Sequence, residues 1–136
     1  MSQENVEVAL KGVDAINRRD LDAFIACVHP DVVWEVDVEV SPFFRGIYRG
    51  RAEMREWFEQ SFLEVWESFH VDVEEITEAS DGRVFLGMFA TARGRGSGVE
   101  TEVRAWSVLW FADGKVARRK LFGTRDDALE AAGLRE

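Results

Sequence analysis

The chain has 136 residues, which is enough for one domain with a substantial core and too few for two. It carries 26 acidic against 17 basic residues, and the resulting net charge of −9 opposes binding to nucleic acids or anionic membranes. No apolar run approaches the ~20 residues of a membrane span, and the amino terminus lacks the basic and apolar regions of a secretory signal. We therefore predict a single cytoplasmic domain over residues 1–136, with no nucleic-acid or membrane partner.

The chain has one cysteine, Cys27, and two histidines. One cysteine cannot form an internal disulfide, and so few soft ligands leave no plausible set for zinc. Cys27 lies in a predicted helix, where a small packing residue is the favoured interpretation. We predict neither a metal nor a cofactor.

Two helices are predicted at the start of the chain. The first is capped by Ser2 or Asn5 and ends near Arg18, with its apolar residues spaced as a single stripe. Asp20 is the predicted cap of a second, short helix that Pro30 ends. Two such helices have too little apolar surface to close a core alone, so both must lie against a sheet.

Residues 31–40, DVVWEVDVEV, form a predicted strand with one face exposed to water. In this register Trp34 and Val36 lie on the apolar face and Asp37 on the polar one. A slip of one residue would exchange the faces and turn Asp37 inward, so both registers stay open. Residues 41–48 are predicted as a rim loop or a short edge strand.

Residues 50–66 form the third and longest predicted helix. Its apolar stripe is bulky and mostly aromatic, and it consists of Met54, Trp57, Phe58, Ser61, Phe62, Val65 and Trp66. A stripe of this kind suits a helix laid across the concave side of a curved sheet. A further strand is predicted over residues 70–79.

Three apolar runs predict an antiparallel meander of strands over residues 83–92, 102–111 and 115–122. The first two are joined by a glycine-rich loop. Asp113 and Gly114 join the last two, and this dipeptide is the strongest short hairpin signal because a type I′ turn needs positive φ at both central residues. We predict positive φ at Gly114, and also at Gly82 in the turn before the meander.

Both faces of the middle strand of the meander are largely apolar, so the sheet must be covered on both sides. Trp106, Val108 and Trp110 share one face. Leaving them in water would expose a patch of about a few hundred Å², which predicts a homodimer through this face. The opposite face carries the small residues Ala105 and Ser107, where a filled core would favour bulk, and this predicts a cavity.

A short final helix is predicted after Thr124, which can cap it, and Gly133 ends it. Helices before an antiparallel meander predict an α+β fold. In this fold a curved, mixed and mostly antiparallel sheet wraps around a long helix to form a cone.

With these elements in place, the chain resembles the SnoaL-like branch of the nuclear transport factor 2-like fold, which includes polyketide cyclases, ketosteroid isomerases and limonene epoxide hydrolases. The resemblance rests on three segments: MSQENVEVALKGVDAINRRDLDAFIACVHPDVVWE at the front, YRGRAEMREWF in the middle, and RGRGSGVETEV with FADGKVARRKLFGTRDDALEAAGL at the end. It implies a blind apolar pocket inside the cone and frequently a dimer through the outer sheet face. A fold of this kind hosts many unrelated chemistries.

The residues of the known enzymes have no counterparts in this chain. By the resemblance, the general-base aspartate of a ketosteroid isomerase matches Val36, its oxyanion-hole tyrosine falls near Gly12 and its protonated aspartate near Ser107. The water-holding tyrosine and asparagine of an epoxide hydrolase match Trp34 and Val36. The positions of its paired aspartates hold no carboxylate.

Helix phase, strand alternation and the resemblance together predict one pocket inside the cone. Its predicted lining is Trp34, Val36, Tyr48, Phe58, Phe62, Leu86, Met88, Ser107, Leu109 and Arg119. Small-molecule pockets are usually apolar with a few convergent polar groups, and here Tyr48 and Arg119 take that place. The predicted ligand is a small apolar molecule.

Three residues are candidates for catalysis. Asp37 would be a general base if it faced the pocket, although a solvated face is the favoured reading. His70 would transfer protons, against the commoner alternative of a histidine on the rim. Arg119 would bind a substrate carboxylate or enolate if it pointed inward, and otherwise pairs with a nearby acid.

Two functions remain open from the sequence. One is a cofactor-free isomerase, cyclase or hydrolase that acts on a small apolar molecule. The other is a non-catalytic ligand-binding protein or dimeric scaffold, which the missing acids favour. A buried carboxylate or histidine beside the ligand would decide for catalysis.

Overall fold

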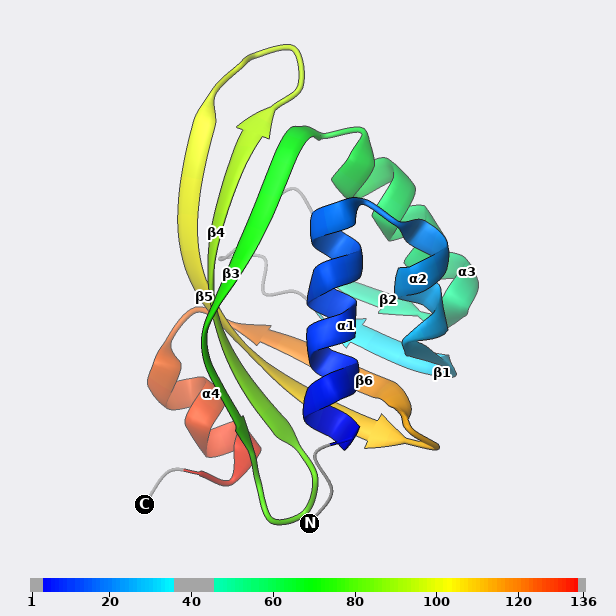
Figure 1. Ribbon diagram of the computed structural model, residues 1–136, viewed down its shortest axis with the longest axis vertical. Coiled ribbons are helices and arrows are strands. Elements are labelled where there is room, and N and C mark those ends of the chain that lie inside the picture. The colour runs from blue at the N-terminus through cyan, green and yellow to red at the C-terminus, as the bar shows by residue number, and fades with distance from the viewer. Residues whose placement is uncertain (1–3, 36–45, 135–136) are drawn as a thin grey trace.

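Three helices lie on one side of a curved sheet and a fourth lies on the other in the computed structural model, which describes residues 4–35 and 46–134 (Figure 1). In chain order the elements are α1 (Glu4–Arg18), α2 (Leu21–Ala26), β1 (Val28–Glu35), β2 (Ile47–Arg49), α3 (Gly50–Glu56), the π-helix η1 (Trp57–Leu63), β3 (Trp66–Glu78), β4 (Val84–Gly94), β5 (Glu100–Ala112), β6 (Lys115–Phe122) and α4 (Arg125–Ala132). None of the helices in these described ranges is long and apolar enough to cross a membrane.

The strands form one sheet in the order β2-β1-β6-β5-β4-β3. Every neighbouring pair is antiparallel except β1 and β6, which run parallel. Figure 1 shows the long strands β3, β4 and β5 curving so that α1, α2 and α3 cover the concave face. The predicted α+β fold with a mixed, mostly antiparallel and curved sheet is therefore confirmed.

The two amino-terminal helices form, but Asn5 lies inside α1 and does not cap it, Ser2 lies outside the described residues, and the second helix is shorter than predicted. Asp20 caps α2, because its side chain accepts a hydrogen bond from the Ala23 backbone N–H. The prediction that Pro30 ends this helix was wrong, since α2 ends at Ala26 and Pro30 lies inside β1. Proline is tolerated there because the β1–β6 register shifts between Val28 and Val33, where a missing N–H costs no regular ladder bond. Cys27 is the C-terminal cap of α2 and not a residue inside it.

The predicted third helix changes type half-way along its length. The α-helical part ends at Glu56, and residues 57–63 continue as a π-helix before β3 begins at Trp66. The Glu64 backbone N–H bonds to the Glu59 carbonyl at 3.1 Å, five residues back, as a π-helix requires. The single helix predicted to Trp66 was therefore wrong at its end, and α1, with 15 residues, is the longest helix among the described ranges.

The wider π-turn brings neighbouring aromatic residues into the same core. Trp57, Phe58 and Phe62 are all buried beneath the concave face of the sheet. Their rings pack on those of Phe24 and Trp34, with centroids 5.1–6.1 Å apart. Each such pair contributes about 0.5–1.5 kcal/mol beyond the burial of its area. This aromatic cluster holds the helices onto the sheet.

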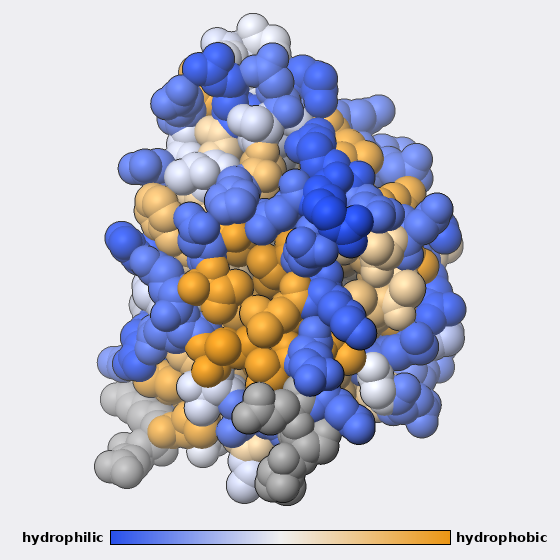
Figure 2. Space-filling view, viewed as in Figure 1, coloured by the Kyte–Doolittle hydropathy of each residue, from blue (hydrophilic) through white to orange (hydrophobic). Residues whose placement is uncertain are grey.

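Strand β3 lies at one edge of the sheet, and α1 covers part of that edge. The side chain of Asn17 both donates to the Val71 carbonyl, at 3.0 Å, and accepts from the Val71 N–H, at 2.7 Å. Asn5 donates to the Gly82 carbonyl at 2.9 Å. An edge strand protected in this way cannot pair there with another chain. Figure 2 shows the hydrophilic outer side of α1 with hydrophobic residues gathered beside it.

The meander and its hairpins follow the sequence pattern. Gly82 has φ +93°, while Asp113 and Gly114 have φ +54° and +74°. The two adjacent positive values are those of a type I′ turn, so the predictions at Gly82 and Gly114 are confirmed. The predicted strand boundaries in the meander lie within two residues of the observed ones, and β3 begins four residues earlier than predicted.

The convex face of the sheet is partly covered by α4, whose cap is Thr124 as predicted. A second buried cluster forms there from Phe85, Val108, Ala128 and Ala132, with Trp106 and Trp110 packed at its border. Part of the apolar surface that predicted a dimer is thus buried within one chain. The homodimer itself stays a prediction.

Candidate functional site

One row of paired residues crosses all six strands on the concave side. From one edge of the sheet to the other it consists of Tyr48, Trp34, Arg119, Leu109, Val84 and Glu78. Residues directly opposite each other on paired strands point to the same face. Tyr48 and Val84 are 2% and 0% exposed and belong to the core beneath the helices, so the whole row faces inward.

Arg119 is the basic residue of this row. Its guanidinium carbon lies 4.5 Å from the centre of the Trp34 ring, a cation–π contact. Within residues 4–35 and 46–134, no acid or carbonyl pairs with the guanidinium. Burial lowers the pKa of Arg119 to about 9, so the side chain is still charged at neutral pH. The protein thus keeps one cation on its apolar face without a counter-ion from the described residues.

The neighbours of Arg119 along β6 behave in the opposite way. Arg118 and Lys120 point to the convex side, where their nitrogen atoms lie 3.3 Å and 4.0 Å from the carboxylate of Glu35. Arg118 also covers the ring of Trp110 at 4.4 Å. Strand alternation therefore places two of these three consecutive cations outside, where they are paired, and one inside, where it has no partner among the described residues.

Two buried donors accompany Arg119. The Ser107 hydroxyl and the Trp34 indole Nε1 are both buried and have no hydrogen-bond partner among the described residues. Ser107 lies two residues from Leu109, the cross-strand partner of Arg119, which places Ser107 about 7–8 Å diagonally from Arg119. Trp34 pairs directly with Arg119 on the other side. A cation, a hydroxyl and an indole N–H therefore converge on the same part of an apolar face.

One carboxylate also faces inward. Glu78 is at the β3 end of the row, and its Oε1 is buried without a hydrogen-bond partner from the described residues. Its position results from an irregularity in β3: the register shifts between Val73 and Glu75, so the residues after the shift exchange faces. Three strand spacings of about 4.8 Å separate it from Arg119, too far for an ion pair.

A comparison with family models matches residues 10–119 of this chain to the SnoaL-like domain. The chain belongs to the SnoaL-like domain family. A search of curated proteins finds no match to it.

Solved structures share the fold of this SnoaL-like domain at low identity. An NTF2-like protein of unknown function from Burkholderia pseudomallei is 20% identical with a TM-score of 0.78, covering 96% of this chain and 97% of its own. TerC is 21% identical with a TM-score of 0.76, covering 96% and 98%. The epoxide hydrolase/cyclase-like enzyme SalBIII is 18% identical with a TM-score of 0.74, covering 92% and 94%. At these identities the likeness shows the fold alone.

The structure brings most of the predicted pocket residues of the SnoaL-like domain to one side of the sheet. Leu86 pairs with Ser107, and Met88 pairs with Ala105, so both face the same side as Arg119. Phe58 and Phe62 lie beneath them, in the aromatic cluster, where neighbouring rings already occupy their faces. The predicted positions Val36 and Asp37 lie outside the described residues.

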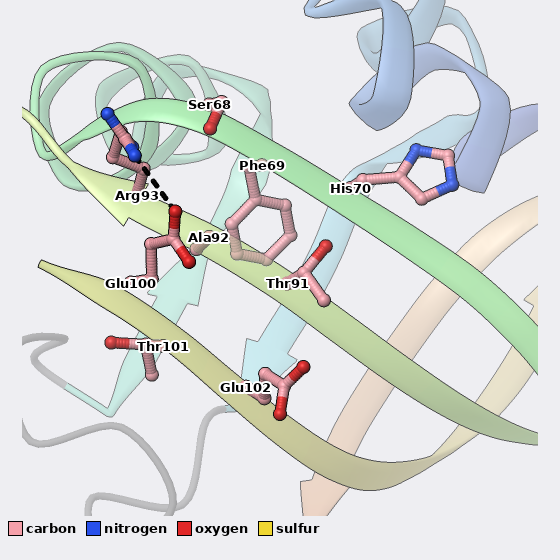
Figure 3. Close-up of a pocket in the computed structure, with 9 residues that line it drawn as sticks. All are labelled: Ser68, Phe69, His70, Thr91, Ala92, Arg93, Glu100, Thr101 and Glu102. Carbon is pink, nitrogen blue, oxygen red and sulfur yellow. Dashed lines mark hydrogen bonds and ion pairs between the residues drawn. The ribbon is translucent and has the colours of Figure 1, made fainter.

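His70 lies elsewhere, in the wall of a hollow formed by β3, β4 and β5. This hollow of about 730 Å³ is lined by residues near the start of β3, the end of β4 and the start of β5 (Figure 3). Arg93 and Glu100 pair in its wall at 2.8 Å, and His70 pairs with Asp72 at 3.0 Å, with 58% of the histidine side chain exposed. Water screens such exposed pairs, so they would interact only weakly with a ligand. The inner row is therefore the better candidate site.

The described residues contain no cluster of three or more histidine, cysteine or acidic side chains placed to hold a metal ion. The polar side chains that remain as candidates for function are those of the inner row. Glu78 is the inward acid that sequence reasoning missed, because uninterrupted alternation from Val71 and Val73 would turn Glu75 inward instead. The available signal was a pair of adjacent acids, Glu74 and Glu75, which no regular strand in that phase can keep exposed together.

Proposed function

We propose that this SnoaL-like domain binds a small, largely apolar molecule against the concave face of its sheet. The observation that carries the proposal is the pair of unpartnered donors, Ser107 and Trp34, on an otherwise apolar surface. A buried donor without an acceptor costs about 1–3 kcal/mol, a cost that a ligand acceptor would offset. The π-helix beside them adds support, because such turns occur frequently at functional sites.

The known structures agree with a small-molecule role on this fold. TerC, the structural neighbour described above, was crystallised with polyporic acid. A protein with a ketosteroid isomerase-like fold from Catenulispora acidiphila was crystallised with trimethylamine. These ligands belong to those proteins, and for this chain they support only the general class of function.

A titration of flat apolar ligands tests the proposal. We expect 2-naphthamide to quench the fluorescence of Trp34, identified as the part of the signal that Trp34→Phe removes. Ser107→Leu replaces the unpartnered hydroxyl with a larger apolar group and should weaken binding, whereas the matched variant Thr77→Leu, on an exposed convex position of β3, should leave it unchanged. Unaltered tryptophan signals in the presence of saturating ligand would contradict the proposal.

A second candidate function is catalysis without a cofactor, as an isomerase, cyclase or hydrolase. Glu78 favours it, because an inward carboxylate with a buried oxygen is a candidate general base. We still expect no isomerisation of a Δ5-3-ketosteroid, since the position that matches the isomerase aspartate is Val36. Turnover of a bound ligand that Glu78→Gln abolishes and Glu75→Gln preserves would establish catalysis over simple binding.

We further propose a homodimer formed through the convex face around Trp106 and Trp110, which α4 leaves half-buried. Trp110→Glu should place a charge at this face and lower the sedimentation coefficient from that of a dimer to that of a monomer. Phe122→Glu, at the far border of the same cluster, is the companion variant. A monomeric wild-type protein would exclude the dimer outright.

A further inference from the structure

The charge arrangement around Arg119 specifies the ligand more narrowly. The net charge of the whole chain is −9, yet the described part of the inner face near Arg119 holds a cation and no anion. The adjacent cations Arg118 and Lys120 turn away and are neutralised by Glu35. This acidic protein thus places Arg119 on its apolar side, away from the acids that could form an ion pair with it.

The geometry of Arg119 leaves its donors available. A guanidinium carries five N–H donors in one plane, and the Trp34 ring lies against it at 4.5 Å. The guanidinium N–H groups have no hydrogen-bond partner among the described residues, so they are available for an acceptor. The Ser107 hydroxyl and the Trp34 Nε1 add neutral donors nearby. These groups together offer donors and one positive charge.

We propose that the ligand of the concave face is a flat organic anion, an apolar ring system bearing a single carboxylate that Arg119 binds through its two-pronged edge. This inference rests on the proposed function. A carboxylate matches the planar fork of arginine with two parallel hydrogen bonds. One cation with two neutral donors suits one negative charge, and the aromatic residues suit the rings. The ring system would lie along Trp34 and the apolar residues Leu86 and Leu109.

A matched pair of ligands separates the charge from the apolar part. Isothermal titration calorimetry with 2-naphthoate and 2-naphthamide compares a carboxylate with a neutral group of the same shape. We expect the wild-type protein to bind 2-naphthoate at least about tenfold more tightly, because hydrogen bonds to charged groups are the strong ones. Arg119→Met keeps the side-chain length, and it should remove this preference, so that the affinities for 2-naphthoate and 2-naphthamide come within about twofold of each other.

The control for this variant is its neighbour on the same strand. Arg118→Met also removes one positive charge and one cation–π contact, but from the convex side. It should keep the preference for 2-naphthoate. A loss of preference in both variants would mean that overall charge, and not Arg119, selects the anion, and this would overturn the inference.

The remaining outcomes distinguish the two proposals. Equal binding of both ligands by the wild-type protein would overturn the anion inference and leave the binding function standing. Binding of neither ligand would overturn the proposed function and the inference with it. An NMR spectrum of the arginine side chains gives an independent readout: the Nε–H signal that Arg119→Met removes should shift with 2-naphthoate and stay in place with 2-naphthamide.

Discussion

The two faces of the sheet handle charge in opposite ways. On the convex face, charged side chains pair between neighbouring elements. Arg104 of β5 pairs with Glu74 of β3 at 3.0 Å, and Arg125 of α4 pairs with Glu75 of β3 at 2.7 Å. On the concave face Arg119 and Glu78 stay apart and unpaired among the described residues. Exposed pairs contribute little to stability, whereas isolated buried charges are costly. This difference indicates that the charges on the concave face have a role other than folding.

The largest expected change in the free energy of unfolding concerns the aromatic core. Phe58→Ala should lower the free energy of unfolding by about 3–5 kcal/mol, because Phe58 is fully buried and packs on three rings of the cluster. The convex counterpart Phe89, half-buried beneath Arg104, should cost only about 1 kcal/mol when changed to alanine. Urea denaturation measures both. Equal losses would show that the two faces are packed alike.

Substitution of Arg119 tests the concave charge directly and should act in the unusual direction. Arg119→Met should raise the free energy of unfolding of the ligand-free protein by about 0.5–2 kcal/mol, because it removes a desolvated cation. Substitutions that remove such a functional group often stabilise a protein in this way. Arg118→Met should instead lower it by about 0–1 kcal/mol, since it breaks an exposed pair. Thermal or urea unfolding of the two variants gives the comparison.

The pH dependence of stability separates the same two arginines. Burial lowers the pKa of Arg119 to about 9 in the folded state, so the unfolded chain binds more protons above that pH. This group therefore makes the protein gain stability as pH rises through about 9. Arg119→Met should abolish that gain between pH 8 and pH 10, while Arg118→Met retains it. Parallel curves for the wild type and Arg119→Met would refute the assignment of an unpaired inward cation.

The sequence predicts the inward position of Arg119 as one of two alternatives, and the structure selects it. Alternation along KVARRKLF sends either the middle arginine or its neighbours inward, and only the pairing of β6 with both β5 and β1 decides between them. The hairpin at Gly114 alone would place Arg118 opposite Leu109, and a register shift between Trp110 and Phe111 places Arg119 there instead. The overall fold was predictable, because its turns, caps and apolar stripes are local signals.

The missed features depend on non-local geometry. The shift in β3 that turns Glu78 inward depends on the pairing of β3 with β4, and within β3 the adjacent acids Glu74 and Glu75 are only a weak signal of it. The π-helix at Trp57 similarly depends on how its end is held: Arg19 and Arg95 both donate to the carbonyls of Leu63 and Trp66. An i, i+3, i+4 stripe fits an α-helix equally well, so the sequence pattern alone could not reveal the wider turn.

The smallest expected effect concerns the ion pair that ties α4 to the convex face. Arg125 hydrogen-bonds to Glu75 and lowers the pKa of that carboxyl, so the pair stabilises the fold above the ordinary pKa of glutamate and loses this effect as pH falls through the lowered value. Because 36% of the Glu75 side chain is exposed, water screens the pair, and Glu75→Gln should cost only about 0.2–1 kcal/mol at pH 7. Unfolding curves at pH 7 and pH 3.5 should differ less for Glu75→Gln than for the wild type, with the exposed Glu59→Gln as the control. A loss above 2 kcal/mol would mean that the convex face also holds a charge whose pairing the fold requires, and the contrast between the two faces would no longer stand.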